Sequence, residues 1–261
     1  MSAKAPRTID GKPDLSGVWQ VEPPPPGTIE RLYGKDVADG PLATDGDDVN
    51  LHSIYFMNML IDYKKGEEPL TAKARDMMRP AGQAGGGERA PLSYCLPSGM
   101  PNRWFFDRPL TIYQTPKQLA IFYEADGAFR EIHTDGRKLP EDPLPSWMGY
   151  SSGHWDGDTL VVDSNGYNTR TRLSGGYPHS ENMRIQERFR RRDYGHLDID
   201  ITVIDPEMLT KPVTVKVTEV LLPKSDTMEY FCTEGERDAS NMAAVRAATQ
   251  KAAAPPANAN R

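Results

Sequence analysis

Ionisable and aromatic residues crowd the segment from Phe129 to Asp193, between runs that have the composition of β-strands. Four of the five histidines lie in this segment or just after it: His133, His154, His179 and His196. A segment that serves only packing would not need so many titratable groups beside Gly and Pro turns. It is therefore predicted to form the rim and lining of a site, although it contains no motif that is specific to one type of reaction.

Glu187 is the sharpest candidate for proton transfer. Neighbouring side chains of a strand point to opposite faces, so one face of the predicted strand 183–191 carries Met183, Ile185, Glu187 and Phe189. A carboxyl on an apolar face is expected to have a raised pKa, which suits a general acid or base near neutrality. An internal salt bridge to Arg137 or another arginine is the alternative, because a buried charge is normally paired.

His179 and Glu181 precede that strand in the sequence PHSE. Their i, i+2 spacing places them on one face if the strand extends back to them. His179 could then transfer protons near neutral pH while Glu181 orients its ring. A loop histidine that caps the end of the fold is the alternative.

Two residues of the sequence IHTDGR repeat this spacing, His133 and Asp135, and Asp135 is a further catalytic candidate that could orient His133. Arg137 follows and could hold an anion with two parallel hydrogen bonds. The dipeptide Asp135-Gly136 favours a simple turn instead.

Three aromatic residues complete this predicted site. Tyr150 is assigned as a phenolic donor, and Trp147 and Tyr167 as a stacking wall, unless all three only close one end of the fold. Arg184 is assigned as a second anion contact, although strand alternation puts it opposite Glu187.

A metal site is a further alternative, because two histidines and one carboxylate can bind a transition metal. The candidate ligands are His133, Asp135, His154, Asp156, His179 and Glu181. No HxH, HExxH or CxxC spacing enforces such a site. The chain also lacks a strand–GxSxG–helix motif, a Rossmann fingerprint and a Walker motif, so no cofactor is expected.

The strand signals recur at short intervals with tight turns between them, such as Asp126-Gly127 and Asp156-Gly157. This pattern predicts a mainly β fold, an antiparallel barrel with peripheral helices. The predicted strands are 15–22, 110–114, 118–124, 128–134, 149–155, 159–163, 183–191, 197–204, 213–222 and 228–232.

Apolar periodicity predicts helices at 47–63 and 71–78. The expected organisation is an N-terminal arm (1–14), a barrel domain (15–235) with a helical insertion at about 47–80, and a helical then disordered tail (236–261).

The composition restricts the class of partner. The formal charge is −6 and the isoelectric point is near 5.5, which argues against nucleic acid. No run of about 18 apolar residues could span a membrane as a helix. The expected partner is a small-molecule substrate or ligand, and a homo-oligomer stays open.

Gly17-Val18-Trp19 resembles the Gly-x-Trp signature with which lipocalin-like barrels begin. Over residues 90–235, the chain resembles a functionally undescribed family of exported bacterial proteins. The motifs that carry the resemblance are CLPSGMP, IHTDGRKLPEDPLPSWMGYSSGHWDGDTLVVDSNGYN, PHSENMRIQERFRRRD, DPEMLTKPVTV and EYFC. It implies a β-barrel exported to the periplasm or secreted, and it transfers no activity.

Cys95 and Cys232 are the only cysteines, and each lies beside strand-like sequence. Together with the implied export, this predicts one disulfide, and two separate buried thiols are the alternative.

The predicted function is cofactor-independent acid/base chemistry, of lyase, isomerase or hydrolase type, on a small organic and possibly aromatic substrate. A non-catalytic binder of a small apolar ligand and a metal-dependent enzyme are the alternatives.

Overall fold

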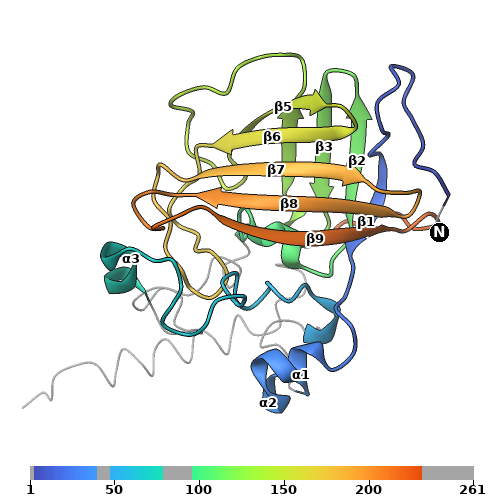
Figure 1. The fold of residues 1–261 in the computed structure, drawn as a ribbon. Coiled ribbons are helices and arrows are strands. Elements are labelled where there is room, and N and C mark those ends of the chain that lie inside the picture. Colours follow the sequence, from blue (N-terminus) through green and yellow to red (C-terminus); the bar gives the residue numbers. More distant parts are fainter. Residues whose placement is uncertain (1–2, 40–47, 79–95, 231–261) are drawn as a thin grey trace, which may run out of the picture. The chain divides into compact units, whose positions relative to one another are not determined.

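The computed structural model describes residues 3–39, 48–78 and 96–230. Its centre is a closed β-barrel, as the sequence predicts (Figure 1). Nine of the predicted strands are present, with small shifts at their ends: β1 Gly17–Val21, β2 Leu110–Thr115, β3 Gln118–Tyr123, β4 Phe129–His133, β5 Tyr150–Asp156, β6 Thr159–Asn165, β7 Arg184–Arg191, β8 His196–Ile204 and β9 Val213–Leu221.

The barrel has an odd number of strands, so it cannot close with antiparallel pairs alone. The single parallel pair joins β4 and β5, where Ile132 lies beside Ser151. Residues 134–149 make the crossover that this pair requires. The barrel closes where β1 pairs with β9, with Trp19 beside Leu221. Gly157 has a positive φ of 60° in the hairpin between β5 and β6, the conformation expected of that turn.

In its described part, the long connection between β1 and β2 carries three short α-helices: α1 Thr28–Tyr33, α2 Lys35–Ala38 and α3 Ala72–Met77. It also carries the 3₁₀ segments η1 Val49–Leu51 and η3 Asn102–Phe105, while η4 Ala125–Gly127 follows β3. Figure 1 shows α1 and α2 below the barrel and α3 to its left. The predicted helix at 71–78 is confirmed, and the side chain of Thr71 caps its start.

The predicted helix at 47–63 is wrong, because residues 48–63 form η1 and a series of turns. Three side chains in it accept hydrogen bonds from backbone N–H groups two residues further on: Asp48 from Asn50, Ser53 from Tyr55, and Asn58 from Leu60. Such local bonds compete with the helical pattern. The apolar residues of the segment pack against the core from turns instead.

The tenth predicted strand, 228–232, is not formed over Met228–Tyr230. The N–H of Met228 donates instead to the carboxylate of Glu124 at 3.0 Å. Phe231 and Cys232, like Cys95 and the predicted tail helix, lie outside the described residues. The disulfide therefore stays a prediction.

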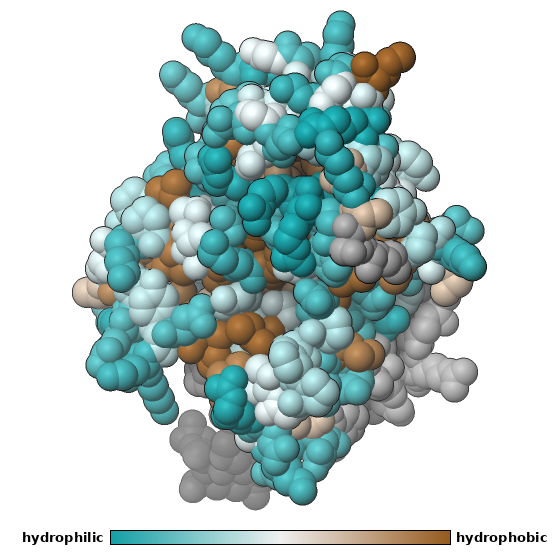
Figure 2. All heavy atoms as spheres, turned by 45° about the vertical axis from the view of Figure 1, so that its right-hand side comes forward, coloured by the Kyte–Doolittle hydropathy of each residue, from teal (hydrophilic) through white to brown (hydrophobic). Residues whose placement is uncertain are grey.

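Inward-facing side chains fill the barrel, and Figure 2 shows a mainly hydrophilic surface with apolar residues in small groups. Trp104, from η3, enters the interior and packs edge-on against Tyr123 and Phe189. Trp19 lies under the guanidinium of Arg191, 4.8 Å from its ring centre. No helix among the described residues is both long and apolar enough to cross a bilayer.

Candidate active site

Glu187 lies inside the barrel, as strand alternation predicts, but it is already paired. Its side chain is fully buried and receives two hydrogen bonds from the guanidinium of Arg130 on β4, one of them 2.9 Å long. The indole N–H of Trp104 donates a third, at 2.6 Å. The internal salt bridge was the open alternative, and its partner is Arg130 rather than Arg137.

Arg130 is itself held from several sides. Its Nε donates to Ser151 at 3.0 Å, and its Nη2 donates to Ser164 at 2.9 Å. Although burial opposes the charge, the carboxylate of Glu187 raises the pKa of Arg130 above its ordinary value, so it stays a cation. All these groups are enclosed by core side chains. The cluster links Trp104 to strands β4 and β7, so the carboxylate of Glu187 has a structural role.

His179 lies outside the barrel strands, in the connection between β6 and β7, and is buried. Its Nε2 is 2.9 Å from Oγ1 of Thr171, and its Nδ1 is 3.1 Å from the carbonyl oxygen of Ser180. Burial lowers the pKa of His179 below its ordinary value of 6.5, so the ring is neutral at pH 7.

This geometry fixes the tautomer of His179. A carbonyl oxygen can only accept, so the single proton of the neutral ring must lie on Nδ1 and point at Ser180. Nε2 is then a free base that accepts the hydroxyl proton of Thr171. The carbonyl oxygen of Asn168 is a competing acceptor for that proton, but at 3.4 Å it is further away. A hydroxyl bonded to an oriented imidazole is the arrangement of an activated nucleophile.

Thr171 and His179 line a cleft of about 360 Å³. Its polar lining also includes Lys73, Arg172, Asn182 and Glu207, and two methionines, Met77 and Met208, give it an apolar wall. Lys73 is 2.5 Å from Glu207, which also accepts from Asn182 at 2.7 Å. Arg172 donates to the carbonyl oxygens of Met77 and Gly176. The cleft thus combines both charge signs with a small apolar surface.

Glu181 is exposed and lines the same cleft, but the ring nitrogens of His179 contact Thr171 and Ser180. Glu187 in the barrel interior and His179 in the cleft belong to different hydrogen-bond networks. Glu187 shares no hydrogen bond with His179, and Arg184 is exposed on the outer face of β7. The structure therefore separates the two residues that were expected to share proton transfer.

His133, Asp135, Arg137 and Tyr150 do form a group, at the surface. Arg137 binds both carboxylate oxygens of Asp135, and its Nη1 is 3.5 Å from the hydroxyl of Tyr150. The rings of His133 and Tyr150 are 5.3 Å apart. The bonds from Arg137 lower the pKa of Asp135 to about 2. Asp135 is thus an ionised turn residue, and the guanidinium of Arg137 is already bound to it.

The two remaining aromatic candidates contact other partners. Trp147 is half-buried under the guanidinium of Arg170, which is 4.9 Å from its ring centre. Tyr167 is buried in the barrel core, and burial raises its pKa above its ordinary value, so it stays neutral.

The candidate metal ligands are dispersed. His154 and Asp156 are exposed on β5, and Asp156 pairs with Arg188 at 3.2 Å. Among the residues that the structure describes, no group of three or more His, Cys, Asp or Glu side chains could hold a metal ion.

Sequence reasoning missed four polar residues of interest: Thr171, Asp205, Arg130 and Glu219. Glu219 faces the barrel interior from β9, between Leu197 of β8 and Val21 of β1. Burial raises its pKa well above its ordinary value, and its Oε2 has no hydrogen-bond partner among the described residues. The alternation of Val215, Val217 and Glu219 was a readable signal for this residue.

Comparison of the chain with protein-family models, curated proteins and solved structures found no match. The function is therefore inferred from the geometry of the chain's own residues.

Proposed function

We propose that this protein is a cofactor-independent hydrolase that cleaves a small ester in the cleft around His179. The observation that carries this proposal is the 2.9 Å contact between Thr171 Oγ1 and Nε2 of a neutral, oriented histidine. The volume of the cleft, about 360 Å³, suits a small organic substrate. Of the lyase, isomerase and hydrolase types, a hydroxyl nucleophile favours the last.

The chemistry needs two proton transfers in each half of the reaction. Thr171 Oγ1 attacks the acyl carbon while its proton passes to Nε2 of His179, which gives a tetrahedral alkoxide and an imidazolium. The alkoxide then re-forms the carbonyl and breaks the bond to the alcohol, which leaves with the proton from His179. Water then attacks the Thr171 ester and gives a proton to Nε2 of His179. The second tetrahedral alkoxide collapses, the acid is released, and His179 returns the proton to Thr171 Oγ1.

Positive charge in the cleft supports the alkoxide. Lys73 and Arg172 both line it, and each is held in place, Lys73 by Glu207 and Arg172 by backbone carbonyl oxygens. Fixed charges near a developing anion are a large source of rate enhancement, because they need no reorganisation during the reaction.

The test is hydrolysis of a panel of short-chain p-nitrophenyl esters. His179→Ala and Thr171→Val should each lower kcat/KM by about 10²–10⁴-fold while leaving the circular dichroism spectrum unchanged. Thr169→Val is the matched control, because Thr169 lines the same cleft but has no described bond to the imidazole. Equal activity in wild type and His179→Ala would refute the proposal.

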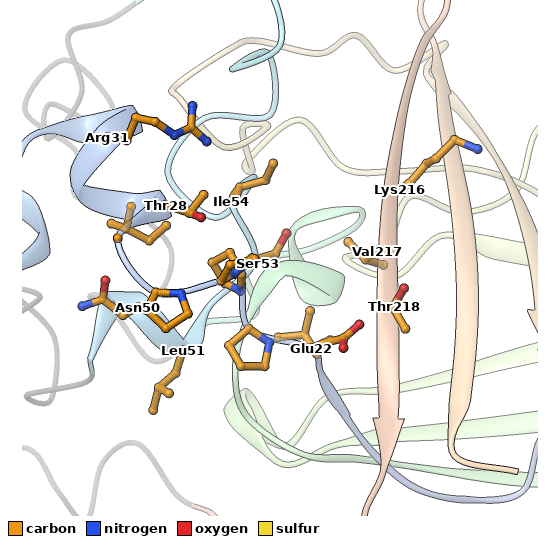
Figure 3. Close-up of a pocket in the computed structure, with 17 residues that line it drawn as sticks. Glu22, Thr28, Arg31, Asn50, Leu51, Ser53, Ile54, Lys216, Val217 and Thr218 are labelled. Carbon is orange, nitrogen blue, oxygen red and sulfur yellow. The ribbon is translucent and has the colours of Figure 1, made fainter. Parts of the chain in front are cut away.

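A second candidate function, small-molecule binding, is favoured by a separate groove of about 980 Å³. Figure 3 shows this groove between α1, which carries Arg31, and the strand that carries Lys216 and Val217, with Ile54 between them. The proline run Pro23–Pro26 forms a rigid apolar wall. The apolar wall fits a small apolar ligand, and polar side chains at the groove, such as Arg31 and Lys216, could orient it.

The groove can be tested with an apolar fluorescent dye, 1-anilinonaphthalene-8-sulfonate. Leu51 lines the groove and is 46% exposed, so Leu51→Asp should weaken binding at least about tenfold by removing apolar contact. Leu144→Asp changes a 92% exposed leucine that does not line the groove and should bind like wild type. Equal dye binding by wild type and both variants would exclude the groove as the binding site.

We also propose that the protein is exported, with a lipocalin-like barrel and a Cys95–Cys232 disulfide. The motif resemblance and the presence of only two cysteines support this. Intact mass after alkylation, with and without reduction, would detect the disulfide.

A further inference from the structure

Asp205, which directly follows β8, is a buried carboxylate next to the cleft that the reaction does not use. Its Oδ2 accepts the backbone N–H of Ser180 at 2.6 Å, and its Oδ1 accepts the Ser180 hydroxyl at 2.8 Å. Oδ1 also accepts the N–H of Glu207 at 3.2 Å. One carboxylate therefore clamps Ser180 through both its backbone and its side chain.

Ser180 is also the residue whose carbonyl oxygen faces Nδ1 of His179. The chain of contacts runs from the Asp205 carboxylate to the N–H and hydroxyl of Ser180, and from the Ser180 carbonyl to the imidazole. A shift of the Ser180 peptide would remove the acceptor that fixes the tautomer of His179. We propose that Asp205 is a positioning residue for the Thr171–His179 pair, acting through Ser180; this inference rests on the proposed function.

The electrostatics support the same role. When His179 takes the proton from Thr171 it becomes an imidazolium, and the negative charge of Asp205 stabilises that state. Burial is the largest influence and lowers the pKa of His179, the Ser180 carbonyl and Asp205 raise it, and Arg172 lowers it. In a Ser-His-Asp triad the carboxylate bonds the imidazole directly. Here a backbone carbonyl, that of Ser180, makes that bond, and the carboxylate accepts the N–H and the hydroxyl of the same residue.

The test uses a readout that does not depend on turnover. The pKa and tautomer of His179 would be measured by NMR in the full-length wild type and in Asp205→Asn, which keeps the size of the side chain but removes its charge. We expect a lower pKa for His179 and a mixture of Nδ1–H and Nε2–H tautomers. Lys73, Arg172, Glu181 and Glu207, the other charged groups that line the cleft, are unchanged in this variant.

Turnover gives a second readout. Asp205→Asn should lower kcat by up to about 10²-fold, less than His179→Ala does, and should cause no further loss when combined with His179→Ala. If Asp205→Asn does not fold, Ser180→Ala removes the hydroxyl contact and keeps the N–H contact, and it should shift the His179 titration in the same direction by less.

The outcomes separate the two proposals. A folded Asp205→Asn protein with the wild-type pKa and tautomer of His179 would overturn the positioning role, even if the wild type hydrolyses esters. A lowered pKa with a mixed tautomer would support it, even if no ester in the panel is cleaved, and the failure would then lie with the proposed reaction.

Discussion

The barrel interior around Glu187 and the cleft around His179 each bury an ionisable group. Only in the cleft does that group contact a hydroxyl that lies beside open space. Glu187 accepts three hydrogen bonds from Arg130 and Trp104 and is enclosed by core side chains. His179 is bonded through Nε2 to a hydroxyl that itself lines an open cleft. Burial alone therefore does not identify a reactive residue. A proton-transfer group also needs a partner whose proton it can take and space for a substrate beside that partner.

The largest expected effect is on the interior. Glu187→Gln removes the negative charge that compensates Arg130, whose side chain stays buried without a counter-ion. Breaking one side of a buried pair costs about 3–5 kcal/mol, so the free energy of unfolding should fall by that amount in denaturant titrations. The His179 NMR signals of the folded variant should not move.

The double variant Arg130→Met, Glu187→Leu is the control. Replacing both partners with apolar side chains strands no charge, so it should lose less stability than Glu187→Gln alone. If Glu187→Gln kept full stability and lost ester hydrolysis, Glu187 would be the catalytic group. That result would contradict the structural role assigned to the barrel interior.

The sequence predicted the inward position of Glu187 because β7 alternates regularly. The same rule could have found its partner. In β4, the inward direction of Ile132 puts Arg130 inside and Phe129 outside, although their chemistry suggests the reverse. Strand period is set by the backbone, so it outweighs the polarity of single residues. If the polarity of Arg130 were taken to mean that it is exposed, its ion pair with Glu187 would not be predicted. That pair is what makes Glu187 a structural residue.

Where the backbone has no period, the sequence singled out His179 but not its partner Thr171. Thr171 and His179 lie in an irregular connection, and only the folded chain brings Thr171 Oγ1 to the imidazole. The segment 47–63 failed for a related reason: Ser53 and Asn58 bond the backbone locally and replace a helix with turns. Regular elements were readable from pattern, whereas loop geometry depends on contacts between residues far apart in the sequence.

A smaller effect is expected at the second interior carboxyl, Glu219, which has no cationic partner among the residues that the structure describes. Its raised pKa means that the folded state holds the proton after the unfolded state has released it. Stability is therefore fully present below the ordinary glutamate pKa and is lost as pH rises toward the folded value. Glu219→Gln cannot ionise, so it should equal wild type near pH 4 and exceed it at pH 8 in thermal melts. An equal difference at both pH values would contradict this assignment.

In the cleft, the lowered pKa of His179 sets the pH dependence of turnover. Nε2 acts as a base only when the ring is neutral, and burial moves the loss of that form to a pH below 6.5. The logarithm of kcat/KM should therefore stay level from pH 8 to 6.5 and decline only at lower pH. A decline that begins above pH 6.5 would assign the base role to another group.

The smallest effect is expected on the outer face of the same strand. Arg188 follows Glu187 in β7, points outward and pairs with Asp156 at 3.2 Å, with side chains 43% and 66% exposed. Water screens this pair and solvates either partner when the other is lost, so Asp156→Asn should change the free energy of unfolding by only about 0–1 kcal/mol. The two variants remove the same kind of charge from arginine pairs on opposite faces of one strand. A loss in Asp156→Asn as large as that in Glu187→Gln would mean that the effects come from the hairpin turn or the strand, rather than from burial of the charge.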